Sequence, residues 1–153
     1  MVWIYDCDAN APEHQNVRAW LEGERGRRGV IETEELLVNT VIIIEIIHNL
    51  RRLAGLTPTV VYDYVSRIMT LRTMKVEEFD RNLLTESMRS FEDYYRYGIG
   101  GRDATILAAM RRNDVSSIAT HDRNILAITD FERIDPVVKP PLILRRGHTF
   151  KRK

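Results

Sequence analysis

Residues 40–50 read TVIIIEIIHNL, so a single carboxylate, Glu45, lies among five isoleucines. A charged carboxylate in apolar surroundings is costly unless it is paired, protonated or bound to a cation. Apolar residues recur here at helical spacing, at Val41, Ile44, Ile47 and Leu50. The β-branched run also permits a strand, but the pattern continues to Leu53, which is too long for a typical strand. We therefore expect a helix that begins near residue 40 and stops at Gly55.

Short strands and further helices alternate around this helix. Apolar, β-favouring runs predict strands at 2–5, 35–39, 74–79, 115–120 and within 131–137. Capping residues and helical spacing predict helices from Pro12 to the glycine-rich stretch 23–29, and over 57–71, 80–97 and 102–113. This alternation predicts the α/β class, with a parallel sheet covered by helices on both faces.

Two of these helices have an apolar face that we expect to turn inward. Over 80–97 the expected stripe is Leu83, Leu84, Met88, Phe91 and Tyr95. Over 102–113 the expected inward residues are Ile106, Leu107 and Met110.

Length and composition predict one domain, residues 1–139, followed by a basic C-terminal tail, 140–153. The formal net charge is +1, which does not by itself indicate a nucleic-acid binder, although 24–29 and 144–153 concentrate positive charge. A single cysteine, Cys7, excludes an intrachain disulfide and favours a reducing, cytoplasmic setting. The run 41–47 is too short to cross a bilayer, so no membrane partner is expected.

Three acidic residues in three separate segments form the candidate site. Asp122 follows the strand predicted at 115–120, Asp103 lies in the first turn of a predicted helix, and Glu45 lies on the apolar helix. In open α/β sheets ligands bind beyond the carboxyl ends of the strands, so the three acids can converge there.

Each acid also has a purely structural explanation. Asp103 could simply favour a helix N-terminus, and Asp122 could form an Asx turn. Glu45 could pair with one of three arginines, Arg51, Arg52 or Arg102.

A divalent cation would account for all three acids together. Clustered carboxylates raise one another's pKa, and a metal ion reverses that penalty. Oxygen ligands without a histidine or cysteine cage suit Mg²⁺ or Mn²⁺. The four histidines show no spacing typical of a zinc site. Such an ion can lower the pKa of a bound water and bind phosphodiester oxygens.

The motifs around these acids resemble those of the PIN-domain ribonucleases, most closely the VapC toxins of prokaryotic toxin–antitoxin pairs. NTVIIIEIIHNLRR resembles the family helix with its acidic residue, here Glu45. GGRDATILAAMRR resembles the segment carrying the next aspartate, Asp103, and SSIATHDRNI resembles the strand and turn carrying another, Asp122. DANAPEHQNVRAWLE resembles the first helix and its approach. The likeness covers nearly the whole chain.

The resemblance implies a three-layer α/β/α fold with a short parallel sheet. It also implies cleavage of RNA with Mg²⁺ or Mn²⁺ held by Glu45, Asp103 and Asp122, homodimerisation, and inhibition by a small VapB-like antitoxin. Thr120 is expected to assist by hydrogen bonding, and Arg51, Arg52 or Arg102 to attract RNA.

The N-terminus departs from the family pattern, because the first family aspartate would precede Met1. A start further upstream is one explanation. A degenerate member, in which Asp6 or Asp8 serves in part, is the other. Absence of the first strand should leave its neighbours with unpaired backbone groups. The alternative function is a non-catalytic module that binds RNA or protein.

Overall fold

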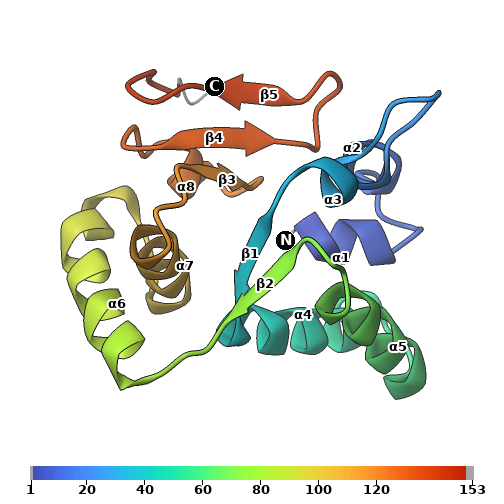
Figure 1. The fold of residues 1–153 in the computed structure, drawn as a ribbon, viewed down its shortest axis with the longest axis horizontal. Coiled ribbons are helices and arrows are strands. Elements are labelled where there is room, and N and C mark those ends of the chain that lie inside the picture. Colours follow the sequence, from blue (N-terminus) through green and yellow to red (C-terminus); the bar gives the residue numbers. More distant parts are fainter. Residues whose placement is uncertain (1, 151–153) are drawn as a thin grey trace.

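The computed structural model describes residues 2–150 and consists of short strands embedded among helices (Figure 1). In chain order the elements are α1 (Val2–Cys7), α2 (His14–Glu22), α3 (Val30–Thr33), β1 (Leu36–Asn39), α4 (Thr40–Arg52), α5 (Pro58–Met69), β2 (Met74–Glu77), α6 (Arg81–Tyr94), η1 (Tyr95–Tyr97), α7 (Gly101–Arg112), β3 (Ser117–Ala119), α8 (Arg123–Leu126), β4 (Glu132–Asp135) and β5 (Leu142–Leu144). The predicted helix at 40–53 and the strand before it are confirmed. None of the helices in this described part is long and apolar enough to span a membrane.

The strands form two small sheets. β1 and β2 pair in parallel, with Val38 opposite Val76. β3 and β4 also pair in parallel, and β5 adds to β4 in the antiparallel sense. Among the described strands, β1 pairs only with β2, and β3 pairs only with β4. The α/β class with short parallel pairing is confirmed.

The N-terminal segment is helical, so the strand predicted at 2–5 is wrong. Val2 and Ile4 are both buried but lie on opposite sides of α1, and Val2 packs with Val17 and Leu21 of α2. A run of four residues is too short for periodicity to separate helix from strand. Ile4 packs into the core cluster formed mainly by α4 and α5. The tertiary contacts therefore decide the conformation here.

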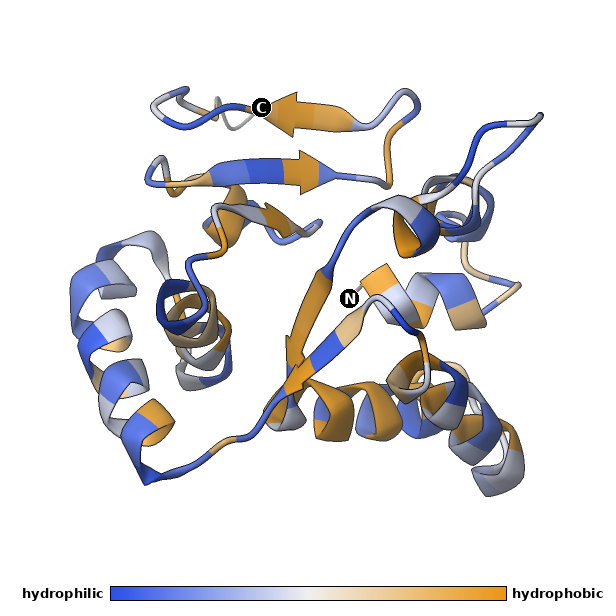
Figure 2. Cartoon of the chain, in the orientation of Figure 1, coloured by the Kyte–Doolittle hydropathy of each residue, from blue (hydrophilic) through white to orange (hydrophobic). Residues whose placement is uncertain are grey.

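Helix α4 is hydrophobic along most of its length (Figure 2). Ile43, Ile46 and Leu50 are buried, whereas Ile44 and Ile47 face outward. Asn39 caps the helix, its side-chain oxygen accepting the Ile42 N–H at 2.9 Å. The residue that ends β1 thus fixes where α4 begins.

Helix α6 buries a different face from the one predicted, and only Leu83 of the predicted stripe is buried. Its buried residues are Leu83, Ser87, Ser90 and Tyr94. The remaining members of the expected stripe, Leu84, Met88, Phe91 and Tyr95, are all exposed. Small serines allow α6 to pack closely on the alanine-rich α7, where Ala108 and Ala109 are buried beside Leu83. On α7, Leu107 and Met110 are buried as predicted, and Ile106 is partly buried.

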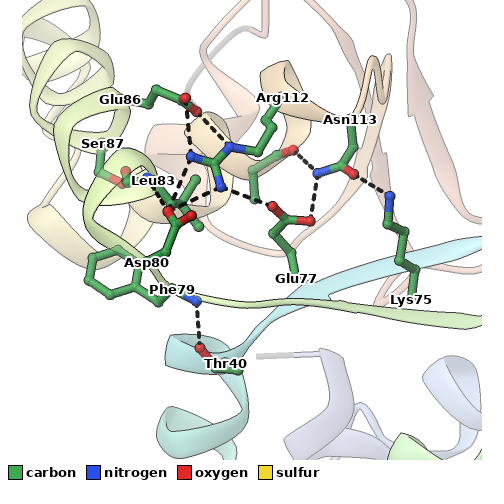
Figure 3. Close-up of polar contacts among 11 residues, drawn as sticks. Thr40, Lys75, Glu77, Phe79, Asp80, Leu83, Glu86, Ser87, Arg112 and Asn113 are labelled. Carbon is green, nitrogen blue, oxygen red and sulfur yellow. Dashed lines mark hydrogen bonds and ion pairs between the residues drawn. The ribbon is translucent and has the colours of Figure 1, made fainter.

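Arg112, the last residue of α7, joins α7 to the connection between β2 and α6 (Figure 3). Its guanidinium donates to Glu86 at 3.0 Å, to Glu77 at 3.1 Å and to Asp80 at 3.2 Å. Asp80 in turn caps α6 by accepting the Leu83 N–H at 2.6 Å. The guanidinium of Arg112 therefore links α7 to β2, to the connection after it and to α6, and so helps to fix the position of α6 against α7.

Part of the segment expected as a tail is ordered by contacts with the preceding strand. Residues 142–144 form β5, and the fully buried Arg133 of β4 donates to the Arg145 carbonyl at 3.2 Å and to the His148 carbonyl. Burial lowers the pKa of Arg133. Backbone carbonyl acceptors therefore stabilise this guanidinium, and the charge of Asp130 also favours its protonated form.

Candidate active site

Glu45 lies in the second turn of α4 and is partly exposed, with 25% of its side chain accessible. Its Oε1 accepts a hydrogen bond from the Arg102 guanidinium of α7, forming an ion pair between residues 57 positions apart. The helix is therefore not buried on all sides at this point. Of the three arginines considered, Arg102 is the partner.

Asp103 lies in the first turn of α7, where its Oδ2 accepts the Gly100 N–H at 3.1 Å. Burial is the main factor raising the pKa of Asp103, and the Gly100 hydrogen bond opposes it. The negative charges of Asp122 and Glu45 raise this pKa further, while Arg102 lowers it. Asp103 is therefore within electrostatic reach of both other acids.

Asp122 follows β3 and caps the short helix α8. Its Oδ1 accepts the Asn124 N–H at 2.7 Å, which is an Asx turn, and its own N–H donates to the Thr120 Oγ1 at 3.0 Å. Thr120 is buried, with 8% of its surface exposed. Thr120 therefore holds the backbone of Asp122 in place, so the structural explanation for Asp122 is correct but does not exclude a ligand role.

Two buried residues that the sequence analysis missed join α4 to α7 beside these acids. The Nδ2 of Asn39 donates to the Thr105 Oγ1 at 3.0 Å, and this hydroxyl donates to the Arg102 carbonyl at 2.8 Å. Asn39 and Thr105 are 2% and 6% exposed. The position of Asn39 immediately before a helix was the available signal, because asparagine is a preferred N-cap.

The other candidate residues lie elsewhere. Arg51 donates to the Leu56 carbonyl, and Arg52 is exposed at the end of α4, about 10 Å along the helix axis from Glu45. The Oδ2 of Asp6 lies 2.7 Å from the Tyr64 hydroxyl of α5, and Asp8 accepts the Asn10 N–H. In the described part of the chain, Asp6 and Asp8 thus contact Tyr64 and Asn10, and neither residue is seen in contact with one of the three acids.

The donor set fits a hard divalent cation in kind, since all three side chains offer carboxylate oxygens. Over residues 2–150, however, no group of three or more His, Cys, Asp or Glu side chains is already arranged to hold a metal ion. One oxygen of each acid is engaged, by Arg102 at Glu45, by Gly100 at Asp103 and by Asn124 at Asp122. A cation would therefore have to draw these carboxylates together and compete with Arg102.

Comparison with known proteins places this geometry in a family. Residues 1–132 match the model of the PIN domain. Among solved structures, the fold is similar to that of VapC20 from Mycobacterium tuberculosis, described as a sarcin–ricin loop cleaving toxin. The two are 15% identical, the match covers 76% of this chain and 81% of that one, and the TM-score is 0.58. No curated protein matches the sequence. Because the family model spans most of its length, the chain belongs to the PIN domain family.

Proposed function

We propose that the protein is a metal-dependent endoribonuclease, and that it is the toxin of a VapBC-type pair. The observation that carries the proposal is the ion pair between Glu45 and Arg102, which brings α4 to the first turn of α7, where Asp103 is the next residue. The charges of Glu45 and Asp122 both raise the pKa of Asp103, in keeping with this proximity. These are the acids that the family resemblance selects, and they come from α4, α7 and the end of β3. The likeness to the fold of VapC20 supports the same proposal.

Glu45, Asp103 and Asp122 would hold Mg²⁺ or Mn²⁺, which would supply an acidified water and neutralise phosphate charge. The chain itself positions these groups. Thr120 fixes the backbone at Asp122, and the Gly100 N–H orients the Asp103 carboxylate. Arg102, whose side chain is 67% exposed, and the basic stretches near 24–29 and 144–150 would attract RNA by a salt-sensitive interaction.

Replacement of Asp103 tests the proposal. We expect Asp103→Asn to abolish Mn²⁺-dependent cleavage of RNA, because an amide is a neutral and weaker ligand. Cleavage is measured on a labelled RNA with protein free of contaminating nucleases. The matched control is Asp63→Asn, an exposed aspartate of α5, which should cleave like the wild type. Full activity in the Asp103 variant would exclude this assignment.

The alternative is a non-catalytic PIN module that binds RNA or protein. The ion pair between Arg102 and Glu45 favours it, because the guanidinium holds one of the three acids. Titration of the protein with Mn²⁺ separates the two functions. The nuclease takes up the ion at a specific site, and the module does not.

The outer face of α6, formed by Leu84, Met88 and Phe91 and continued by Tyr95 of η1, supports homodimerisation. These side chains are 48%, 66%, 47% and 65% exposed. Their spacing of three and four residues is that of helices that pack along a common seam. A two-fold axis would let this face cover its own copy. A VapB-like antitoxin as second partner, and a cytoplasmic location, belong to the same proposal.

A further inference from the structure

We propose that Arg102 is an exchangeable counter-ion for Glu45: it neutralises this carboxylate while no divalent cation is bound and releases it when a cation enters. The inference rests on the proposed metal site. It assigns Arg102 a role in controlling access to that site, in addition to any contact with RNA.

The ion pair is asymmetric in exposure. The Arg102 side chain is 67% exposed, whereas that of Glu45 is 25% exposed. Exposed ion pairs are weak, because water and salt screen the attraction and long side chains lose freedom on pairing. The guanidinium can therefore leave Glu45 for solvent without opening the core.

Only the side chain of Arg102 has to move. Its carbonyl accepts the Thr105 hydroxyl at 2.8 Å, and Thr105 is held by the buried Asn39 at 3.0 Å. The backbone on which Arg102 and Asp103 lie is thus fixed to the start of α4. Release of the guanidinium leaves the spacing between α4 and α7 unchanged.

The position of Arg102 in α7 favours exchange as well. It is the second residue of the helix, where the backbone N–H groups make a positive side chain unfavourable. The neighbouring acids Glu45 and Asp103 offset this repulsion. A divalent cation bound to those acids would neutralise their negative charge and so remove the attraction that holds the Arg102 guanidinium beside Glu45.

A permanent structural role for Arg102 predicts the opposite result. If Arg102 only held Glu45 in a productive rotamer, its removal would weaken cation binding. If it competes with the cation, its removal strengthens cation binding. The sign of the change in Mn²⁺ affinity therefore decides between the two roles.

The experiment is calorimetric titration of Mn²⁺ into the full chain at fixed ionic strength. We expect Arg102→Gln to bind Mn²⁺ roughly two- to fivefold more tightly than the wild type, the range for loss of one exposed ion pair. Arg102→Lys, which keeps the charge but loses the planar fork, should fall between them. The matched control is Arg123→Gln, which removes an exposed positive charge next to Asp122 and should change affinity less than Arg102→Gln.

A second arm tests whether the effect passes through Glu45. In a Glu45→Gln background, Arg102→Gln should bring no further gain in affinity. Equal or weaker Mn²⁺ binding by Arg102→Gln, beside measurable binding by the wild type, overturns the inference and leaves the nuclease proposal standing. Tighter binding without RNA cleavage supports the inference and overturns the nuclease. Absence of Mn²⁺ uptake in every variant overturns both.

Discussion

The protein contains two main cores, and they contribute unequally to the candidate site. The first, the α4–α5 core, includes Ile4, Val38, Ile43, Ile46, Leu50, Val61 and Val65. The second, the α7–α8 core, includes Tyr94, Ile99, Ala104, Leu107, Met110, Ile125, Ile128 and Phe131. Glu45 belongs to the elements of the first core, whereas Asp103 and Asp122 belong to those of the second. Neither core alone assembles the three acids.

The difference shows what makes the site vulnerable. Within each core, apolar contacts hold the helices that carry or follow the acids, which are α4 in the first core and α7 and α8 in the second. Between the cores, side-chain bonds near the acids include the Asn39–Thr105 hydrogen bond and the Glu45–Arg102 ion pair. The buried hydrogen bond should set the spacing of the acids, and the exposed ion pair should not, because buried polar bonds are costly to break and exposed pairs are not.

The largest effect is expected where the two cores meet. Asn39→Ala removes the cap of α4 and leaves the buried Thr105 hydroxyl without its donor. We expect a loss of about 2–4 kcal/mol in the free energy of unfolding, measured in urea. The control is Asn49→Ala, a partly exposed position on the same helix, which should cost less than about 1 kcal/mol. Equal losses at the two positions would contradict a special role for Asn39.

A smaller effect is expected inside the first core, at Asp6. The Tyr64 hydroxyl lies 2.7 Å from both the Trp3 carbonyl and Asp6 Oδ2, yet a phenol has one proton to donate. The Oδ1 of Asp6 is buried without a partner in the described structure. A protonated Asp6 would donate to Tyr64 and free its hydroxyl proton for Trp3. Burial accordingly raises the pKa of Asp6, although the Tyr64 hydrogen bond opposes the shift.

Stability should therefore depend on pH through Asp6. A carboxyl whose pKa is raised on folding contributes stability that is fully present below its ordinary pKa of about 4 and lost as pH rises through the folded value. Asp6→Asn places a permanent donor there. We expect it to raise unfolding free energy at pH 7 by about 1 kcal/mol, with the gain disappearing near pH 3. A constant difference across this range, or a loss at pH 7, would refute the proton assignment.

The smallest effect on the folded monomer is expected at the outer face of α6. Phe91→Gln should change unfolding free energy by about 0.5 kcal/mol or less at concentrations where the chain is monomeric. It should nevertheless weaken self-association, measured by sedimentation, if this face joins two copies. Glu92→Gln, its exposed neighbour, is the matched control. Unchanged association in Phe91→Gln would exclude this face as the dimer contact.

The sequence predicted where most helices and strands occur better than it predicted which face of each helix is buried. The helix carrying Glu45 was predictable because its pattern was too long for a strand. The helix predicted over 57–71 is also present, as α5, with Thr57 as its N-cap and Pro58 as its first residue. The face of α6 was not predictable from its large apolar residues, because α7 accepts a surface of serines instead. Residues 2–5 were assigned to a strand because so short a run has no usable period. These failures arise from packing between elements distant in the sequence.

For the candidate site as well, the sequence indicated individual residues but not the contacts between elements. The three acids could be selected as candidates from the sequence because each lies at a recognisable position: on an apolar helix, in a first helical turn and after a strand. Arg102 was one of three possible partners for Glu45, and only the approach of α7 to α4 selects it. Thr105 carried no signal, since a threonine inside a helix is ordinary and its role depends on Asn39, 66 positions away.

Paramagnetic broadening by Mn²⁺ tests the central claim directly. With ¹⁵N-labelled protein and substoichiometric Mn²⁺, one shared site predicts that the amides around Glu45, Asp103 and Asp122 broaden together, while those at the far end of α4 broaden less. Broadening confined to one of these segments, or none at any of them, would contradict a site that joins the two cores.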